Sequence, residues 1–524
     1  MLVCCESLGG ETIICVIQSV RMKRAQIGSS SSPPGTEVRH EKIARSKSGL
    51  RAGNLVAPPR KMFRCTVHDS IYLEALLVQI VDTRYFQRLR NLKQLGTTPY
   101  VYPCANHERF DHSLGVAHLA EQLCRSIAAH PMPTGVEKPT EHDILCVKIA
   151  ALCHDLGHGP YSHVFDSYLA DKGHKHEDLS VRLIRRLIEE HDIKLGDNHE
   201  TDLRFIEELI MGDDLEGERW GRGYSKSYLY DVVSNADSGL DVDKLDYLQR
   251  DPQMTGNAAP QFVITRLLEN AQVRVALFDG EPKERPCICF ATKVKKDVLG
   301  VFRTRFIMHE ETYTHKVAKG FELLLVDYLT AADALGHLYC KGGRKLKLGE
   351  TARPGNEEAF LKMTDASVLF YYDQLLNACD DEWASKPESS AESAERRELA
   401  RVRRLQQRVD ARLPYRCIGD CEWADGTSTE KNPMDNVRFY EKGDGPDDLA
   451  TQQHDTHFDD ANLPRAFESK RFRAFFKDER SSPKYEAAVQ AVAQLGGWRN
   501  VPRLISDCAD EFEDVGAMSQ EPPS

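Results

Sequence analysis

The feature that most constrains the fold is a series of long segments with helical periodicity between residues 61 and 340. In each segment apolar residues recur about every 3.6 positions with polar residues between them, which is typical of amphipathic helices. These segments cover residues 73–95, 113–130, 143–158, 176–191 and 304–335. No apolar run approaches the roughly 18 residues that a membrane span needs. We therefore predict a mainly α protein with a large helical domain over residues 61–340 and no membrane partner.

The two ends of the chain differ from this helical region in composition. Residues 1–60 contain the run SSSSPPG and many basic residues, so we expect a disordered leader, with a transit peptide or a basic nuclear address as alternatives. Beyond residue 340 a charged stretch, a short strand and a basic-aromatic stretch are expected at 380–409, 437–442 and 467–479. We predict a smaller mixed α/β lobe over residues 341–504 and an acidic disordered tail over residues 505–524.

Net charge and cysteine usage limit the classes of function. The 524 residues carry a formal net charge of −12, which argues against a protein that mainly coats nucleic acid. The basic-aromatic stretch could still bind a single strand weakly. Fifteen cysteines at irregular spacings include no paired CxxC motif, which fits free thiols in a reducing compartment. We expect an intracellular protein and favour the nucleus over the cytoplasm.

Histidine is concentrated in one part of the chain. Ten of the 19 histidines fall between His107 and His176. Three motifs there and downstream carry acids and bases at close spacing. They are RFDHS with Arg109 and His112; CHDLGHGPYSHVFD with His154, Asp155, His158, His163 and Asp166; and DVDKLDY with Asp241, Asp243, Lys244 and Tyr247.

The His154-Asp155 pair lies at the end of an apolar helix, where the following glycines end the helix. Imidazole and carboxylate together suit a transition metal such as zinc, iron or manganese. His112 and Asp243, from other helices, would complete a site of two histidines and two carboxylates. Open positions on the ion could hold water and a phosphate oxygen. The other HD dipeptides, at 68–69, 142–143, 191–192 and 454–455, are expected to be turns, caps or surface pairs.

HDLGHGPYSH, RFDHSLG and DVDKLDY resemble the HD superfamily and, more narrowly, the SAM-and-HD-domain deoxynucleoside triphosphate triphosphohydrolases. The resemblance runs from about Lys61 to about Leu335, with an HD core near residues 106–250. It returns in the C-terminal lobe at 412–419, 431–440 and 467–478. Because residues 1–60 are short and polar, we expect no SAM domain.

The resemblance implies an enzyme that converts dNTP and water to deoxynucleoside and inorganic triphosphate, with Mg²⁺ accompanying the nucleotides. It implies metal ligands at His112, His154, Asp155 and Asp243. It places the group around the α-phosphate at His158, His163, Asp166 and His176, of which His163 or His176 could protonate the departing 5′-oxygen. It places the substrate pocket at Gln94, Leu95, Arg109, Lys244, Tyr247, Asp251, Arg305, His309 and Tyr313.

More ordinary roles stay open for some of these residues. His158 could be a helix packing residue and His176 a surface histidine, while Lys244 and Arg305 could form salt bridges on helix faces. The chain also departs from the family at Thr97, Thr98, Glu310, Glu311 and Thr314. These departures could alter base contacts or assembly but leave the metal ligands unchanged.

The resemblance also implies activation by GTP or dGTP through assembly into a homotetramer. The first regulatory nucleotide site corresponds to Lys61, Asp82, Gln87 and Arg90, with Arg412 and Arg416 reaching it from a neighbouring subunit. A carboxylate at 82 can accept from guanine N1–H and N2–H₂, an edge that adenine lacks. The second site corresponds to Val101, Lys293, His315, Lys316 and Lys477.

That second site is incomplete in this chain. Ala291 and Asp297 stand where the family has Arg and Asn, which should weaken triphosphate binding. Residues 82–90 also have a simpler interpretation, as a packed amphipathic helix.

Two rival functions remain at this point. One is an HD hydrolase of cyclic nucleotides, nucleoside monophosphates or nucleic-acid ends. The other is a non-enzymatic nucleic-acid-binding or scaffold protein.

Overall fold

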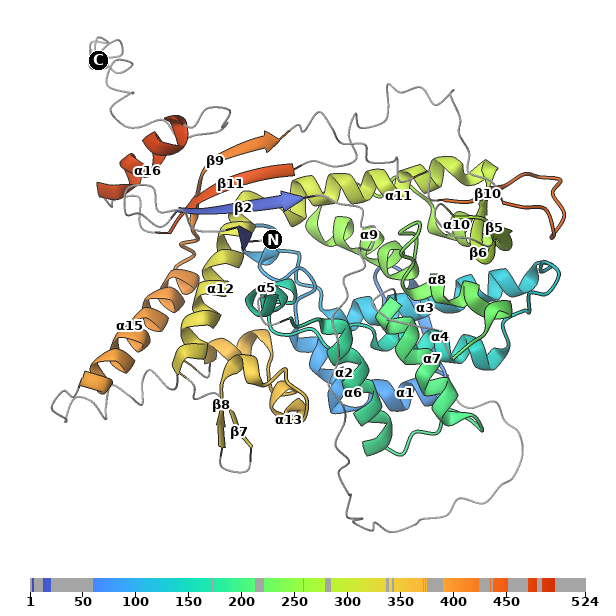
Figure 1. The fold of residues 1–524 in the computed structure, drawn as a ribbon, viewed down its shortest axis with the longest axis horizontal. Helices are drawn as coiled ribbons and strands as arrows, with labels where there is room; N and C mark the ends of the chain where they lie inside the picture. The colour runs from blue at the N-terminus through green and yellow to red at the C-terminus, as the bar shows by residue number, and fades with distance from the viewer. Residues whose placement is uncertain are drawn as a thin grey trace, which may run out of the picture.

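The computed structural model describes most of the chain. The described residues are 2–3, 13–19, 60–374, 390–423, 434–450, 470–477 and 483–494, with gaps at 171–172, 213–220, 258, 279–283, 336–338, 342–343, 371, 373 and 435–436. Helices dominate these residues (Figure 1), which confirms the prediction of a mainly α protein. None of the described helices is long and apolar enough to cross a membrane.

The HD region is a group of packed helices. Its α-helices are α3 (Arg109–Ala129), α4 (Glu141–Cys153), α5 (His163–Leu169), α6 (His176–Glu190), α7 (His199–Met211), α8 (Tyr230–Val233) and α9 (Val242–Thr255). Before it lie α1 (Ala75–Val81), α2 (Arg84–Gln87), η1 (Arg88–Asn91) and η2 (Thr98–Tyr100). After it come α10 (Ile264–Glu269), α11 (Lys295–Met308), the π-helix η7 (His309–Tyr313), α12 (Lys316–Leu335), α13 (Glu357–Phe360), α15 (Ser390–Asp410) and α16 (Pro483–Gln494). Short 3₁₀ turns occur at η5 (Tyr224–Leu229), η6 (Thr292–Val294) and η8 (Leu348–Glu350).

Two of the five predicted helical segments are interrupted. The segment 73–95 divides at Thr83, whose backbone is extended and whose hydroxyl accepts a hydrogen bond from the amide of Phe86. A threonine that caps a new helix in this way ends the preceding one. The segment 304–335 divides at the π-helix η7, a feature that often marks functional sites.

Strands form four small sheets. The largest has the order β1-β2-β11-β9, from Leu2–Val3, Ile13–Ser19, Lys470–Phe476 and Arg416–Trp423. A second has the order β10-β6-β5, from Phe439–Tyr440, Arg285–Ala291 and Ala271–Ala276. Two hairpins pair β3 (Lys61–Cys65) with β4 (Asp69–Leu73), and β7 (Tyr339–Lys341) with β8 (Arg344–Leu346). The strand expected at 437–442 is confirmed at Phe439–Tyr440.

The predicted disordered leader is wrong for two stretches, and the shorter one, Leu2–Val3, forms β1. Ile13–Ser19 form β2, which pairs antiparallel with β11 over its whole length. The sequence IICVIQS is rich in β-branched residues, which favour strands, and β11 supplies a partner some 450 residues away that composition alone does not reveal. The remainder of the leader and the tail over 505–524 lie outside the described residues.

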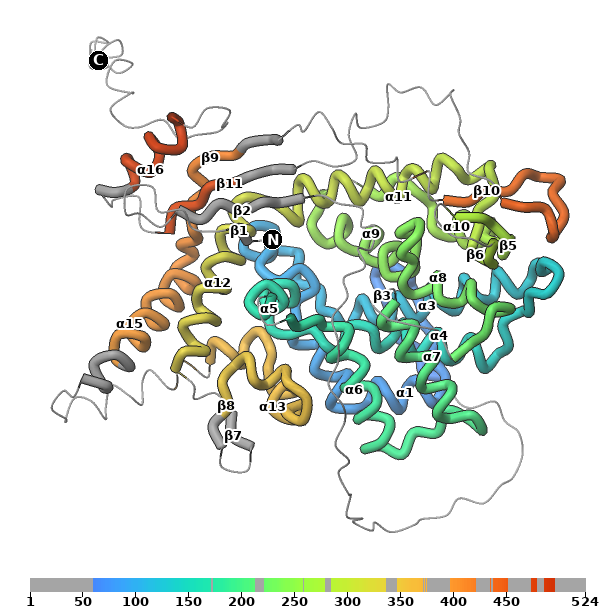
Figure 2. Tube along the Cα trace, viewed as in Figure 1, coloured from blue at the N-terminus to red at the C-terminus, as the bar shows by residue number. Residues whose placement is uncertain are grey.

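One hydrophobic core joins most of the helices. It includes Leu152 and Phe165 of the HD region together with Phe360, Leu399 and Phe475 of the predicted C-terminal lobe. Helix α15 packs along α12 (Figure 2). This core is continuous across residue 340, so it does not divide the chain at that point. The separate lobe over residues 341–504 stays a prediction.

Candidate metal centre and active site

Three helix ends converge on one place. His112 lies in the first turn of α3 and His154 directly follows α4. Helix α4 starts at a capping box in which Thr140 and Asp143 satisfy each other's backbone amides. At the start of α9, the carboxylate of Asp241 accepts from the amide of Lys244, which places Asp243 in the first turn.

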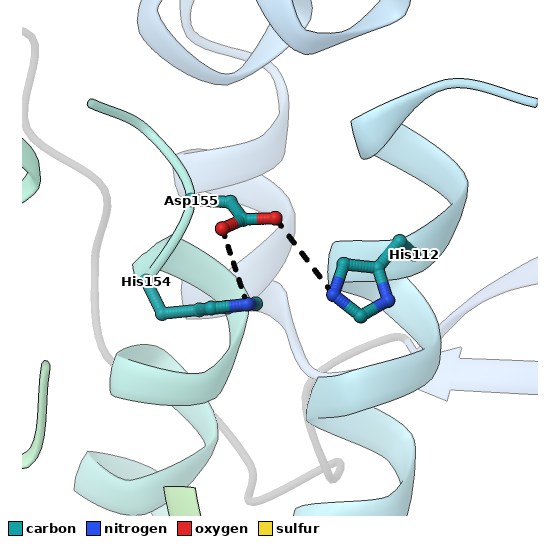
Figure 3. A group of neighbouring side chains, drawn as sticks. All are labelled: His112, His154 and Asp155. Carbon is teal, nitrogen blue, oxygen red and sulfur yellow. Dashed lines mark ion pairs between the residues drawn. The ribbon is translucent and has the colours of Figure 1, made fainter. Parts of the chain in front are cut away.

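The four predicted metal ligands face one another. Asp155 directs one carboxylate oxygen toward each imidazole (Figure 3), with Nε2 of His154 at 3.4 Å and Nε2 of His112 at 3.7 Å. Asp243 Oδ1 lies 3.0 Å from His112 Nε2 and 3.6 Å from His154 Nε2. Ligand atoms held around an ion at ~2.1 Å are about 3 to 3.5 Å apart. The fold therefore brings the four predicted ligands together at distances that a metal ion would accept.

The orientation of both imidazoles fits metal binding. Nδ1 of His154 lies 2.8 Å from the carbonyl of Ala151, and Nδ1 of His112 lies 2.7 Å from Asp246. Each Nε2 is thereby left to face the two carboxylates. Burial alone would raise the pKa of Asp155, but the charges of Arg109 and His154 hold it well below its ordinary value. A set of two imidazoles and two carboxylates suits a divalent metal.

A second cluster of donors, His142, Cys146 and Asp202, also lies within ligand distance. There Arg222 donates to Asp202 at 2.8 Å and to Asp143 at 2.6 Å. Because the guanidinium of Arg222 already neutralises the Asp202 carboxylate, we interpret this cluster as an ion-pair network and not as a metal site.

Asp166 is surrounded by three histidines beside the metal centre. Its Oδ2 lies 3.2 Å from Nδ1 of His163 and 3.4 Å from Nδ1 of both His158 and His176. Burial lowers the pKa of His158 to about 4, with Arg109 and His176 adding to the effect. Burial also opposes a charge on His176, but the hydrogen bond and charge of Asp166 outweigh it, so its pKa is raised. His158 is therefore neutral near pH 7, whereas the raised pKa of His176 lets it keep a proton to higher pH than a free imidazole does.

Three of the predicted substrate-pocket residues are cationic: Arg109, Lys244 and Arg305. Arg109 is buried and donates to Asp155 at 2.5 Å and to Ser162 at 2.7 Å. In the described part of the chain, its remaining Nη2 has no hydrogen-bond partner. Lys244 pairs with Asp241 at 2.5 Å. Burial raises the pKa of Tyr247, and the positive charges of Arg305 and Lys244 oppose that rise. Arg109 therefore contacts a predicted metal ligand directly, whereas Lys244 forms a salt bridge with Asp241 at the start of α9.

Part of the predicted substrate pocket forms a hydrogen-bonded network around the buried Asp251. Tyr313 donates to Asp251 at 2.6 Å, and His107 lies 2.8 Å from the other oxygen of the same carboxylate. The ring of Tyr313 lies 6.3 Å from those of Tyr247 and His309. Gln94 is buried, and its Oε1 accepts no hydrogen bond among the described residues. Leu95 is half-buried beside Gln94.

Residues of the first predicted regulatory site also lie together. Lys61 pairs with Asp82 at 3.2 Å, and Arg90 donates to Gln87 at 2.9 Å. Both members of the Lys61–Asp82 pair are about half exposed. Arg412 donates to the carbonyl of Tyr100, next to Val101, and Arg416 is exposed at the start of β9. The alternative of a plain continuous helix over 82–90 is weakened, because that segment is not one helix.

Residues of the second predicted regulatory site contact other parts of the chain. Lys477 pairs with Asp327 at 2.6 Å, and the ring of His315, just before Lys316, lies 5.9 Å from that of Tyr102. Lys293 borders a cavity of about 740 Å³ that Ala291 also lines. Asp297 is buried and paired with Arg266. Its negative charge is thus offset internally, which lessens the repulsion expected from the sequence.

Sequence reasoning missed several residues that hold the site in place. Buried Arg88 donates to the carbonyls of Leu156, His158 and Met363. The buried carboxylate of Asp365 accepts from the amides of Lys93 and Tyr161 at 2.8 and 2.6 Å. Arg88 looks like one more basic residue on an amphipathic stretch. Asp365 lies outside every motif, and no sequence signal points to it.

Comparison with known proteins agrees with this geometry. Residues 109–251 match the HD domain family. A Mus musculus protein named deoxynucleoside triphosphate triphosphohydrolase SAMHD1 is 33% identical over 429 residues, which cover 72% of this chain and 63% of the relative. Its Danio rerio namesake is 32% identical over 476 residues, covering 78% and 71%. Putative HD domain-containing protein L394 of Acanthamoeba polyphaga mimivirus is 32% identical over 331 residues, covering 60% and 65%.

The helical core, the convergent ligands and the matched residues define an HD-domain protein with a divalent-metal site. The extent of the similarity narrows this class further. The chain belongs to the SAMHD1 family of deoxynucleoside triphosphate triphosphohydrolases, which confirms the resemblance seen in the motifs. It spans 63% of the length of the mouse relative and 71% of that from Danio rerio.

Proposed function

We propose that this protein is a metal-dependent dNTP triphosphohydrolase that releases deoxynucleoside and inorganic triphosphate. The observation that carries the proposal is that the predicted metal ligands and a group of histidines lie side by side. The four ligands His112, His154, Asp155 and Asp243 adjoin the histidine group around Asp166. Family membership supports the choice of dNTPs, because the relatives are named for that activity.

The residues divide the reaction among them. Arg109, Lys244 and Arg305 bind the triphosphate, whose charge of about −4 suits guanidinium and ammonium groups. Tyr313 and Asp251 hold the sugar, and Gln94 contributes an unpaired amide oxygen. Asp166 orients His163 and His176, one of which protonates the departing 5′-oxygen while water attacks the α-phosphorus. A divalent metal bound by the four ligands supplies Lewis-acid polarisation and helps to activate water.

The metal is zinc, iron or manganese, and Mg²⁺ accompanies the bound nucleotides. Assembly and regulation extend the proposal. GTP or dGTP binds at Lys61, Asp82, Gln87 and Arg90 and promotes a homotetramer, to which Arg412 and Arg416 of a neighbouring copy contribute. The second site, with Ala291 in place of arginine, binds its nucleotide weakly. The nucleus is the proposed compartment.

Substrate profiling tests this function against its rivals. Purified protein is incubated with each dNTP, with and without GTP, and separately with cyclic nucleotides, nucleoside monophosphates and short single strands. We expect turnover of dNTPs alone. Hydrolysis confined to one of the other substrates would favour a different HD hydrolase, and salt-dependent strand binding without turnover would favour a nucleic-acid-binding protein.

Sugar discrimination gives one prediction. Because Tyr313 donates to Asp251 at the proposed sugar site, wild-type protein should hydrolyse dGTP far better than GTP. Tyr313→Ala should lower the ratio of kcat/KM for dGTP to kcat/KM for GTP by roughly 10-fold or more. Exposed Tyr224 provides the control, since Tyr224→Ala should leave the ratio unchanged. Equal hydrolysis of GTP and dGTP by the wild type would contradict this role.

The pH dependence gives a second prediction. Asp166 raises the pKa of His176, and a proton donor works only below its pKa. The rate should therefore fall as pH rises through that raised value. Asp166→Asn removes the cause of the raised pKa, so the alkaline limb should move to lower pH and kcat should drop by roughly 100-fold. An alkaline limb that stays in place in this variant, measured from pH 6 to 10, would rule out this assignment.

A further inference from the structure

Asp246 is a completely buried carboxylate behind the metal centre, and it is not among the site residues predicted from the sequence. It lies on α9, one turn after Asp243. Its Oδ2 is 2.7 Å from Nδ1 of His112, the face of that imidazole opposite the predicted metal position. Arg250 donates to both oxygens, at 2.8 and 2.9 Å. The carboxylate is therefore fixed from one side and bonded to a predicted ligand on the other.

The packing of α3 against α9 permits this approach only because residue 115 is glycine. A Cβ at Gly115 would lie 1.9 Å from Oδ1 of Asp246 and 2.5 Å from Nη2 of Arg250. Both atoms belong to buried side chains that are hydrogen-bonded to each other. Gly115 thus brings His112, three residues earlier on α3, within reach of Asp246.

A third group reaches the same carboxylate from a different part of the chain. His68 lies in the turn of the β3–β4 hairpin, and its Nε2 is 2.6 Å from Oδ1 of Asp246. The His68 side chain is only 6% exposed. The hairpin is further tied to α9 by Cys65, whose sulfur lies 3.7 Å from the guanidinium of Arg250. His68 and His112 are therefore linked through one carboxylate.

We propose that Asp246 is a positioning residue that orients His112 for the metal. His68 in turn holds Asp246 by a hydrogen bond, so the orientation of Asp246 depends on where the β3–β4 hairpin lies. Hydrogen bonds from a carboxylate to the outer nitrogen of a ligating histidine set the direction of its lone pair. The same hairpin begins with Lys61, which pairs with Asp82. A shift of this hairpin would consequently alter how firmly the metal is held. The inference rests on the metal site of the proposed function.

The test measures Mn²⁺ affinity and dissociation rate by electron paramagnetic resonance after removal and readdition of metal. His68→Ala should weaken Mn²⁺ binding roughly 10–100-fold, and His68→Gln, which keeps an N–H donor, should restore part of the loss. His118→Gln is the matched control, because this neighbouring ring lies 5.5 Å from His68 and has no bond to Asp246 among the described contacts. Asp246→Asn should weaken binding at least as much.

Thermal unfolding of each apoprotein separates positioning from stability. If Asp246→Asn fails to fold, the Mn²⁺ affinity of His68→Ala still tests the inference, because the His68→Ala protein keeps the Asp246–Arg250 pair. Wild-type Mn²⁺ affinity in a folded His68→Ala protein would overturn the inference while leaving the proposed function intact. A wild-type protein that binds no Mn²⁺, Fe²⁺ or Zn²⁺ at all would overturn both.

Discussion

Asp155→Asn is expected to abolish turnover, with kcat reduced by more than about 1,000-fold, and to lose the bound metal. Asp155 faces both predicted histidine ligands, at 3.4 and 3.7 Å, so its oxygens are central to the site. Asparagine has nearly the same shape but no negative charge, which removes one of the two anions that hold a divalent ion. The measurement combines elemental analysis of the purified variant with dNTP hydrolysis.

Asp111→Asn serves as the matched control. Asp111 precedes His112 on α3 but has no place in the proposed site, so this variant should keep both metal and activity. Full metal occupancy in Asp155→Asn would show that the ion is bound elsewhere.

Asp82→Asn is expected to eliminate GTP-dependent assembly and the accompanying increase in rate, while the metal content stays that of the wild type. The Asp82 carboxylate is half exposed and paired only with the flexible Lys61 ammonium in the described contacts. It is therefore free to accept from a guanine edge. Because binding and assembly are linked, assembly must tighten GTP binding by the same factor that GTP favours assembly. Light scattering across a GTP titration, paired with rates, measures both.

Asp192→Asn provides the comparison for that experiment. Asp192 is exposed and has a left-handed backbone, a conformation that asparagine tolerates well. It should assemble like the wild type. If the wild-type size and rate both ignore GTP, the residues from Lys61 to Arg90 form an ordinary surface, and the protein is a constitutive hydrolase.

The four candidate metal ligands could be proposed from the sequence because each lies in a short, recognisable motif. His154 and Asp155 are adjacent, the glycines after them end a helix, and Asp243 sits in a motif with its own cap at Asp241. Each signal lies within a few residues of the chain. The helices α3, α4 and α6 were predictable for the same reason, since their periodicity is continuous.

The supporting contacts could not be predicted, because they join distant segments. Arg88 acts on the carbonyls of Leu156 and His158 only once the fold brings them together. Tyr161 and Ser162 have left-handed backbones, and this strained turn is held by Asp365, some 200 residues later. Likewise β2 exists because β11 pairs with it. Local sequence cannot specify contacts whose partners it does not contain.

Hydrolysis of dGTP in H₂¹⁸O tests the central claim most directly. Attack of water on the α-phosphorus breaks the bond from phosphorus to the 5′-oxygen. The products should be unlabelled deoxyguanosine and inorganic triphosphate carrying one ¹⁸O on a terminal phosphorus, as read by mass spectrometry and ³¹P NMR. The Asp155→Asn protein should yield neither. Deoxynucleoside monophosphate with pyrophosphate, deoxynucleoside diphosphate with phosphate, or ¹⁸O in the deoxyguanosine would contradict triphosphohydrolysis at this site.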